Sequence, residues 1–258
     1  MTKLVFITGA SSGIGQALAW RYFQAGYSLA LVARRTQVIE AWVSHRAVPK
    51  DCYKIYTADV SVIDDIVAAG QACLAQQGVP DVVVANAGVS IGMDSSQRQD
   101  IDVMAQTFAI NNIGLAATFH PFLDAMLKRK SGTLVGIASV AGIRGMPGHG
   151  AYCASKAGVI SYLEALRGEL KDAGVSVVTI CPGYIDTPMT RKNRYAMPFL
   201  MQPQEFSDRA FDAIANQVSY CVIPWQMGWV AKLVRVIPNG IFDKLLSGRP
   251  RKHRKPDD

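Results

Sequence analysis

The sequence predicts an α/β protein with a single doubly wound parallel sheet, arranged as three α/β/α layers. Short apolar runs alternate along the chain with longer segments of helical pattern. The runs are continuously apolar, which is typical of strands that are buried on both faces of a sheet. Half of the 258 residues are hydrophobic, so the chain can bury a large core without disulfides or a structural metal.

The elements follow from this alternation in chain order. The expected strands are residues 3–8, 29–32, 53–57, 81–86, 133–138 and 175–181. The expected helices are residues 14–25, 36–46, 61–76, 100–128 and 151–171. Ser61 is expected to cap the third helix, ahead of Asp64 and Asp65. In such a sheet, ligands bind beyond the carboxyl ends of the strands, where the strand order reverses.

A glycine-rich turn follows the first strand and opens the first helix. It contains Gly9, Ser11, Ser12, Gly13, Ile14 and Gly15. Glycines let the backbone approach a ligand closely, and a helix amino terminus offers N–H groups to a phosphate. This context predicts the pyrophosphate site of a Rossmann-type fold. A turn without a ligand is the alternative, but it does not account for three glycines and two hydroxyls within seven residues.

The end of the second strand indicates which dinucleotide is bound. An acidic residue usually stands here to hold the ribose 2′-hydroxyl of NAD. This chain has Ala33 followed by Arg34 and Arg35. A guanidinium can pair with a 2′-phosphate, whereas a carboxylate would repel it. We therefore expect NADP, and the alternative is that both arginines are ordinary surface charges.

Tyr152 and Lys156 are four residues apart, so on a helix both project from one face. A nearby ammonium is expected to lower the pKa of the phenol, which would suit it to proton transfer. Ser139 ends an apolar run thirteen residues upstream of Tyr152 and could hold a substrate oxygen in the same pocket. A Tyr-x-x-x-Lys pair also occurs by chance on solvated helices, so it indicates a catalytic site only together with the motifs that precede it.

Together these motifs resemble the short-chain dehydrogenase/reductase family, from Thr8 to about Met189. The resemblance implies a catalytic set of Asn111, Ser139, Tyr152 and Lys156. It also implies cofactor contacts from Asp59, Val60, Asn86, Ala87, Gly88, Pro182, Gly183, Ile185 and Thr187, besides the turn, the two arginines, Tyr152 and Lys156. Asn112 is an alternative to Asn111, but the family spacing N-x-x-G, ending at Gly114, selects Asn111.

The resemblance implies an NADP(H)-dependent oxidoreductase that interconverts an apolar ketone or aldehyde and the alcohol. Tyr152 would be the general acid or base, and Lys156 would lower its pKa and bind the nicotinamide ribose. Ser139 would hold the substrate oxygen, and Asn111 would hold a water that relays protons. The alternative is a non-catalytic NADP(H)-binding redox sensor or scaffold, against which the complete catalytic set argues.

We expect a catalytic domain at residues 1–224, with a substrate loop at 184–203, and an amphipathic extension with a basic tail at 225–258. The loop is expected to supply an adaptable apolar wall. The residues expected in that wall are Met189, Met197, Phe199, Leu200 and Met201.

The extension carries Trp225, Trp229, Leu233 and Ile237 at intervals of four. This stripe is expected to pack on the domain or on a second subunit as a lid, because most amphipathic helices cover a core. The alternative is a helix that lies on a membrane surface. The final Gly-Gly turn that supports tetramers in many members of the family is absent, so we expect a homodimer.

Composition limits the other classes of function. The five cysteines are scattered and odd in number, and the histidines have no metal-ligand spacing, so neither a disulfide framework nor a metal site is expected. Much of the net charge of +7 lies in the last ten residues, without interleaved aromatics, so no nucleic-acid partner is expected. No signal peptide or membrane span is expected. The predicted location is cytoplasmic, with peripheral contact to the inner face of a membrane as the alternative.

Overall fold

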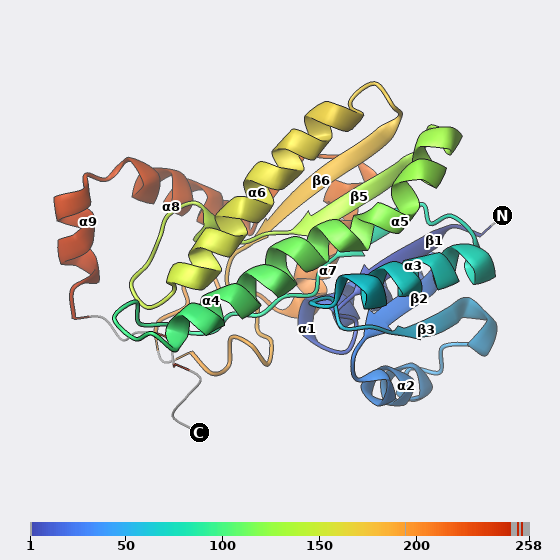
Figure 1. Cartoon of the computed structure of the whole chain (residues 1–258), viewed down its shortest axis with the longest axis horizontal. Helices are drawn as coiled ribbons and strands as arrows, with labels where there is room; N and C mark the ends of the chain where they lie inside the picture. The colour runs from blue at the N-terminus through green and yellow to red at the C-terminus, as the bar shows by residue number, and fades with distance from the viewer. Residues whose placement is uncertain (1, 194, 249–251, 253, 255–258) are drawn as a thin grey trace.

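A seven-stranded parallel sheet forms the middle layer of the computed structural model, which describes residues 2–193, 195–248, 252 and 254 (Figure 1). The strand order is β3-β2-β1-β4-β5-β6-β7. The strands are β1 (Leu4–Thr8), β2 (Ser28–Ala33), β3 (Tyr53–Thr57), β4 (Val82–Ala85), β5 (Gly132–Ile137), β6 (Val175–Pro182) and β7 (Tyr220–Ile223). The winding reverses between β1 and β4, which confirms the predicted doubly wound fold.

Helices cover both faces of this sheet. One layer contains α1 (Gly13–Gln24), α2 (Thr36–His45) and α7 (Pro203–Ala215). The other contains α3 (Ile63–Gln77), α4 (Asp100–Phe108), α5 (Gly114–Arg129) and α6 (Gly150–Leu170). Two further helices, α8 (Trp225–Val236) and α9 (Asn239–Leu246), lie at one edge of the molecule (Figure 1).

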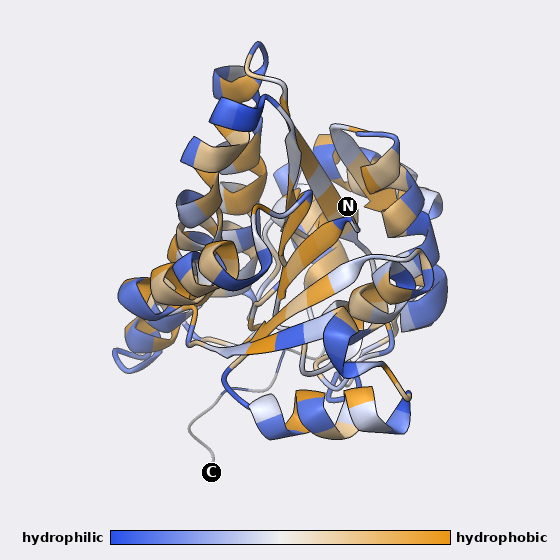
Figure 2. Ribbon diagram, turned by 90° about the vertical axis from the view of Figure 1, so that its right-hand side faces the viewer, coloured by the Kyte–Doolittle hydropathy of each residue, from blue (hydrophilic) through white to orange (hydrophobic). Residues whose placement is uncertain are grey.

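The inner strands are mostly apolar because each of their faces meets a helical layer. Phe6 packs with the α3, α5 and α6 layer, whereas its neighbours Val5 and Ile7 pack with the α1, α2 and α7 layer. All three side chains are fully buried. Hydrophobic residues accordingly concentrate in the strands, and hydrophilic ones on the outer sides of the helices (Figure 2).

The expected strands and helices are present, with ends shifted by at most two residues. The expected Ser61 cap is wrong, because α3 begins at Ile63 and its N-cap residue is Val62. The Ser61 hydroxyl instead donates to Asp59 Oδ1 at 2.7 Å. The expected long helix of residues 100–128 is continuous but contains a π-helical turn at Ala109–Ile113.

Two elements were not expected from the sequence, α7 and β7. β7 pairs with β6 at the edge of the sheet, and its first residue, Tyr220, is exposed. Its four residues, YCVI, form a short apolar run, and such a run alone does not distinguish a strand from a segment of buried helix. The final strand is therefore present, although the glycine turn that follows it in many relatives is not.

Gly70 allows α3 and α5 to pack closely. A Cβ atom at this position would lie 2.6 Å from Cγ of Pro121, inside van der Waals contact. We predict that Gly70→Ala lowers the free energy of unfolding by about 1–3 kcal/mol, because the added methyl group overpacks this contact. Urea denaturation monitored by circular dichroism would measure this change in the free energy of unfolding.

Gly168→Ala on α6 is the matched control, because a Cβ there meets no atom within 4 Å. It should raise the free energy of unfolding by about 0.5–1 kcal/mol, since alanine is the better helix former. Equal effects of the two substitutions would contradict the close packing at Gly70.

Candidate functional site

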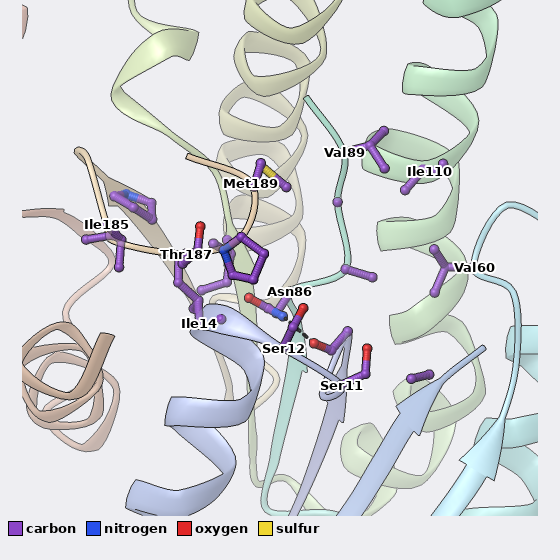
Figure 3. A pocket seen from close by; sticks show the side chains of 18 of the residues that line it. Ser11, Ser12, Ile14, Val60, Asn86, Val89, Ile110, Ile185, Thr187 and Met189 are labelled. Carbon is purple, nitrogen blue, oxygen red and sulfur yellow. Dashed lines mark hydrogen bonds between the residues drawn. The ribbon is translucent and has the colours of Figure 1, made fainter. Parts of the chain in front are cut away.

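The turns that follow β1, β2, β4, β5 and β6 meet at one edge of the sheet and line a single groove (Figure 3). Ile14 and Thr187 lie on one side of it, and Val60, Val89 and Ile110 lie on the other. The expected site residues that line it are Gly9, Ser11, Ser12, Gly13, Ile14, Arg34, Arg35, Asp59, Val60, Asn86, Ala87, Gly88, Ser139, Tyr152, Lys156, Pro182, Gly183, Ile185 and Thr187.

Gly15 and Asn111 lie behind the groove rather than on its surface. A Cβ at Gly15 would lie 2.3 Å from the Gly9 carbonyl oxygen and 2.5 Å from Asn86 Nδ2. Gly15 therefore lets helix α1 pack beneath the turn, and it shapes the groove without lining it. Direct contact between Gly15 and a cofactor stays a prediction.

Thr8 and Asn86 join the first turn to the end of β4. The Thr8 hydroxyl oxygen accepts hydrogen bonds from the backbone N–H groups of Asn86 and Ala87, at 3.1 and 3.2 Å. The Asn86 side-chain amide donates in return to the Thr8 carbonyl oxygen, at 2.9 Å. These bonds fix the two turns on either side of the point where strand order reverses.

The amino terminus of α1 is suited to an anion. Ser12 is its N-cap residue, and the Ser12 side chain makes no capping hydrogen bond. The end of the helix carries partial positive charge beside the groove. Gly13 has a φ of +57°, and a Cβ there would lie 3.0 Å from Thr187 Cγ2, so any larger residue would crowd the groove. These features fit a diphosphate.

Arg34 and Asp59 face each other at the far end of the groove. Arg34 Nη1 donates to Asp59 Oδ2 at 3.3 Å, and the Arg34 side chain is 64% exposed. Burial raises the pKa of Asp59, but hydrogen bonds from Ser61 and the charge of Arg34 outweigh burial and leave that pKa below its usual value. Ion pairs this exposed contribute little to stability, so Arg34 can exchange Asp59 for another anion at low cost.

Ser139, Tyr152 and Lys156 gather where β5 and α6 meet. Ser139 lies two residues after the end of β5. Its hydroxyl accepts from Ala141 N–H at 3.1 Å, and it hydrogen-bonds Tyr152. Lys156 is 4% exposed, and its Nζ donates to the Ile137 carbonyl oxygen at 2.7 Å. That Nζ lies 5.9 Å from the centre of the Tyr152 ring.

The expectation that Lys156 lowers the pKa of Tyr152 is not met. Burial raises the pKa of Tyr152, and the hydrogen bond with Ser139 offsets this only in part. Burial also lowers the pKa of Lys156 from 10.5 to about 8. The amine is directed to a backbone carbonyl instead of the phenol, and desolvation of both side chains dominates.

The π-helical turn between α4 and α5 places Asn111. Its side chain accepts from Val89 N–H at 2.9 Å and donates to the Val89 carbonyl at 3.0 Å and to Ser155 Oγ at 2.9 Å. Asn112 bonds only the Ser155 backbone oxygen, at 2.9 Å. A Cβ at Gly88 would lie 3.2 Å from Asn111 Oδ1 and 3.6 Å from Lys156 Nζ, so both polar groups border Gly88.

A second cavity, of about 950 Å³, adjoins the groove, and we call it the chamber. Ser139, Tyr152 and Gly183 line both spaces. The chamber has polar groups as well as apolar ones, including the pair His149 and Tyr195, whose Nε2 and hydroxyl oxygen are 3.2 Å apart. Isolated polar residues in a loop gave no motif from which the sequence could identify this pair.

The segment after Thr187 lines the chamber differently from expectation. Met189 contributes, together with Asn193 and Tyr195. Phe199 and Leu200 are exposed, and Met201 is buried in the core, where it forms a β-bridge with Ile185. The expected apolar wall is therefore wrong for these last three residues, because the bridge turns Met201 inward. Met197 does not line the chamber either, and its sulfur accepts from Asn193 Nδ2 at 3.5 Å.

The extension closes one end of the chamber. Leu246 of α9 and Lys252 line it. Arg254 pairs with the buried Asp100 at the start of α4, with N–O distances of 2.7 and 3.1 Å. Other residues of the expected basic tail lie outside the described part.

The expected apolar stripe of α8 does not pack on the domain. Trp225, Trp229 and Leu233 each expose more than three-fifths of their surface. The helix is seated instead by Met227 and Ala231 on its opposite side. The sequence pattern could not distinguish these two faces, because both are apolar.

No helix within the described residues has the length and hydropathy to cross a membrane. The same part of the chain holds no group of three or more residues arranged to bind a metal ion.

Comparisons with known proteins agree with this architecture. The family model for short chain dehydrogenases matches residues 3–197. An uncharacterized oxidoreductase of Myxococcus xanthus is 34% identical over 241 residues, which cover 93% of this chain and 95% of that protein.

Two solved structures share the fold at 24% identity. A short-chain dehydrogenase/reductase from Burkholderia phymatum, in complex with NAD, superposes with a TM-score of 0.81 over 100% of this chain and 97% of its own. An alcohol dehydrogenase from Thermococcus sibiricus, complexed with 5-hydroxy-NADP, has a TM-score of 0.76 over 86% and 96%.

The lowered pKa of Lys156 predicts a pH-dependent stability. Between pH 8 and 10.5 the unfolded chain keeps the proton on Lys156 that the folded chain releases, so folding becomes more favourable as pH rises. Relative to Lys156→Met, the free energy of unfolding of the wild type should rise by up to about 1.4 kcal/mol per pH unit in this range. Urea denaturation over this pH range would measure it. The exposed control Lys128→Met should follow the wild type, and parallel curves for Lys156→Met would contradict the shift.

Proposed function

Because the chain belongs to the short-chain dehydrogenase/reductase family of oxidoreductases, we propose that it is an NADP(H)-dependent enzyme that interconverts an apolar ketone or aldehyde and the corresponding alcohol. The observation that carries this proposal is that Ser139 and Tyr152 line both the groove and the chamber. A small molecule in the chamber can therefore reach two hydroxyl groups that also border the dinucleotide groove.

The groove fits a dinucleotide. The turn around Gly13 and the amino terminus of α1 would hold the diphosphate, Asp59 and Val60 the adenosine end, and Lys156 the nicotinamide ribose. When bound, the nicotinamide cofactor supplies or accepts the hydride. The protein's own residues would position the cofactor and the substrate and would transfer the proton.

Two features support NADP over NAD. The end of β2 has Ala33 in place of an acid that would hold a 2′-hydroxyl and repel a 2′-phosphate. Arg34 lines the groove there, and its exposed pair with Asp59 leaves the guanidinium able to take a phosphate.

The raised pKa of Tyr152 suits the role of general acid in carbonyl reduction. A phenol that stays protonated at neutral pH can donate its proton to the oxygen of a ketone as that oxygen becomes an alcohol. The Ser139 hydroxyl, already bonded to Tyr152, would hold the same oxygen in line. Lys156, positively charged below its pKa of about 8, would stabilise the phenolate that remains.

The chamber supports a substrate with an apolar body. Val140, Ala141 and Met146 line it near Ser139, while His149 and Tyr195 offer hydrogen bonds to a polar substituent. No feature of the described residues favours the alternative of a non-catalytic redox sensor or scaffold. The homodimer and the cytoplasmic location stay predictions.

The mechanism predicts that Tyr152→Phe lowers kcat by at least about 100-fold while NADPH binding stays within about twofold, because only the transferable proton is lost. NADPH oxidation with a panel of ketones and aldehydes would measure turnover, and NADPH fluorescence would measure binding. The control Tyr195→Phe removes a chamber hydroxyl that does not line the groove and should retain turnover within about tenfold. Sustained activity of Tyr152→Phe would remove Tyr152 from the mechanism.

The phosphate assignment predicts that Arg34→Ala weakens NADPH binding by about 10- to 100-fold and NADH binding by less than about twofold. The lost charge-assisted bonds are specific to the 2′-phosphate, which NADH lacks. Titrations of both nucleotides would measure this. Arg98→Ala, at an exposed arginine before α4, is the control and should change neither. Equal losses for both nucleotides would refute the assignment.

A further inference from the structure

Helices α8 and α9 project from the domain beside the chamber, in red at the left of Figure 1. Met227 and Ala231 are the buried residues of α8, and α9 has none. We call the pair, residues 225–246, the C-terminal hairpin. Its outward side lies away from the sheet and is uncovered in the described part of the chain.

That outward side is apolar. The large hydrophobic residues of the hairpin that expose more than half of their surface are Trp225, Trp229, Leu233 and Val236 on α8, and Ile241 and Leu245 on α9. On α8 the intervals of four, four and three residues place the first four on one stripe. A large apolar surface exposed to water is typical of a site that binds another protein or a membrane.

The hairpin is fixed in orientation by Arg144. The Arg144 guanidinium donates to the carbonyl oxygens of Val234 and Ile237, the latter at 2.7 Å, and to Asn239 Oδ1 at 3.0 Å. It also stacks 3.8 Å from the centre of the Phe242 ring. The carbonyl groups at the end of α8 are thereby satisfied, and the stripe is held facing outward.

The charges on the hairpin are mostly positive. Lys232, Arg235 and Lys244 are exposed beside the stripe, and Asp243 is the only acid between residues 225 and 246. Lys232 Nζ lies 5.1 Å over the Trp229 ring. Tryptophan, aliphatic residues and flanking cations together are the composition of helices that lie in the interface of an anionic bilayer.

We propose that the outward side of the C-terminal hairpin binds the surface of an anionic lipid bilayer. The hairpin would lie along the surface with the stripe among the acyl chains and the three cations at the headgroups. Leu246 of α9 lines the chamber, so binding would bring one wall of the chamber to the lipid. If the proposed function holds, the substrate would be a carbonyl compound or alcohol dissolved in that lipid.

A second copy of this chain is the competing occupant. A two-fold interface on this side would bring two surfaces of the same net positive charge together, each carrying Lys232, Arg235 and Lys244. Like charges brought together oppose association, whereas anionic headgroups complement all three. Charge therefore favours the bilayer.

Vesicle binding tests the proposal with the full chain. The protein should sediment with vesicles of phosphatidylcholine and phosphatidylglycerol in equal parts, and more weakly with phosphatidylcholine alone or at high salt. Brominated lipids should quench the fluorescence of the wild type. They should quench a Trp225→Phe/Trp229→Phe variant much less, since its remaining tryptophans, Trp20 and Trp42, lie in the domain.

Two pairs of variants separate apolar contact from charge. Leu233→Glu should reduce the vesicle-bound fraction by about tenfold or more, whereas Ile63→Glu, at a residue of α3 that is 52% exposed, should not. The double variant Lys232→Glu/Arg235→Glu should reduce the vesicle-bound fraction by a similar factor, but only on the anionic vesicles. Its control, Arg98→Glu, should not reduce that fraction. Circular dichroism and NADPH oxidation of a water-soluble ketone would verify that each variant is folded.

The outcomes are distinguishable from failure of the proposed function. An active wild-type enzyme that does not bind the vesicles would overturn the membrane proposal and leave the function standing. Specific binding to the anionic vesicles without turnover of any carbonyl compound would overturn the proposed function and leave the membrane proposal standing. If light scattering finds a dimer that Leu233→Glu dissociates, and vesicles bind neither protein, then the face belongs to a second copy and the proposal is wrong.

Discussion

The junction between β1 and β4 is the constraint on which the site depends. The Thr8 hydroxyl accepts two backbone N–H groups from the end of β4, and the Asn86 amide returns a hydrogen bond to β1. The winding of the sheet reverses here, so the connections on either side lead away and leave a groove between them. The strands before the other lining turns pair with these two either directly or through one neighbouring strand.

Burial decides the chemistry that this junction makes available. Lys156 and Tyr152 project from one face of α6 as their spacing requires, but α6 presses that face against the ends of β5 and β6. The Ile137 carbonyl then takes the Lys156 amine, and desolvation moves the two pKa values in opposite directions. Burial therefore opposes the effect that the charge of Lys156 would otherwise have on the pKa of the Tyr152 phenol.

Sequence predicted the groove well because its residues lie in turns whose local chemistry is distinctive. Gly13 needs a positive φ, and Asn86 and Gly88 follow a strand that is apolar throughout. The chamber was harder to predict because tertiary contacts select its lining. Nothing local distinguishes Met189, which lines it, from Met201, which a bridge to Ile185 draws into the core. The same holds for α8, which has two apolar faces, of which only the one with Met227 and Ala231 packs on the domain.

The ion pair between Arg254 and Asp100 joins the C-terminal extension to the start of α4. Its partners are 154 residues apart, and the Asp100 carboxylate is almost completely shielded from water. Loss of the Arg254 side chain would leave that buried negative charge without its ion pair, beside the Asp94 backbone amide that donates to it. The described end of the extension is therefore coupled to the start of α4, and release of Arg254 would disturb that helix.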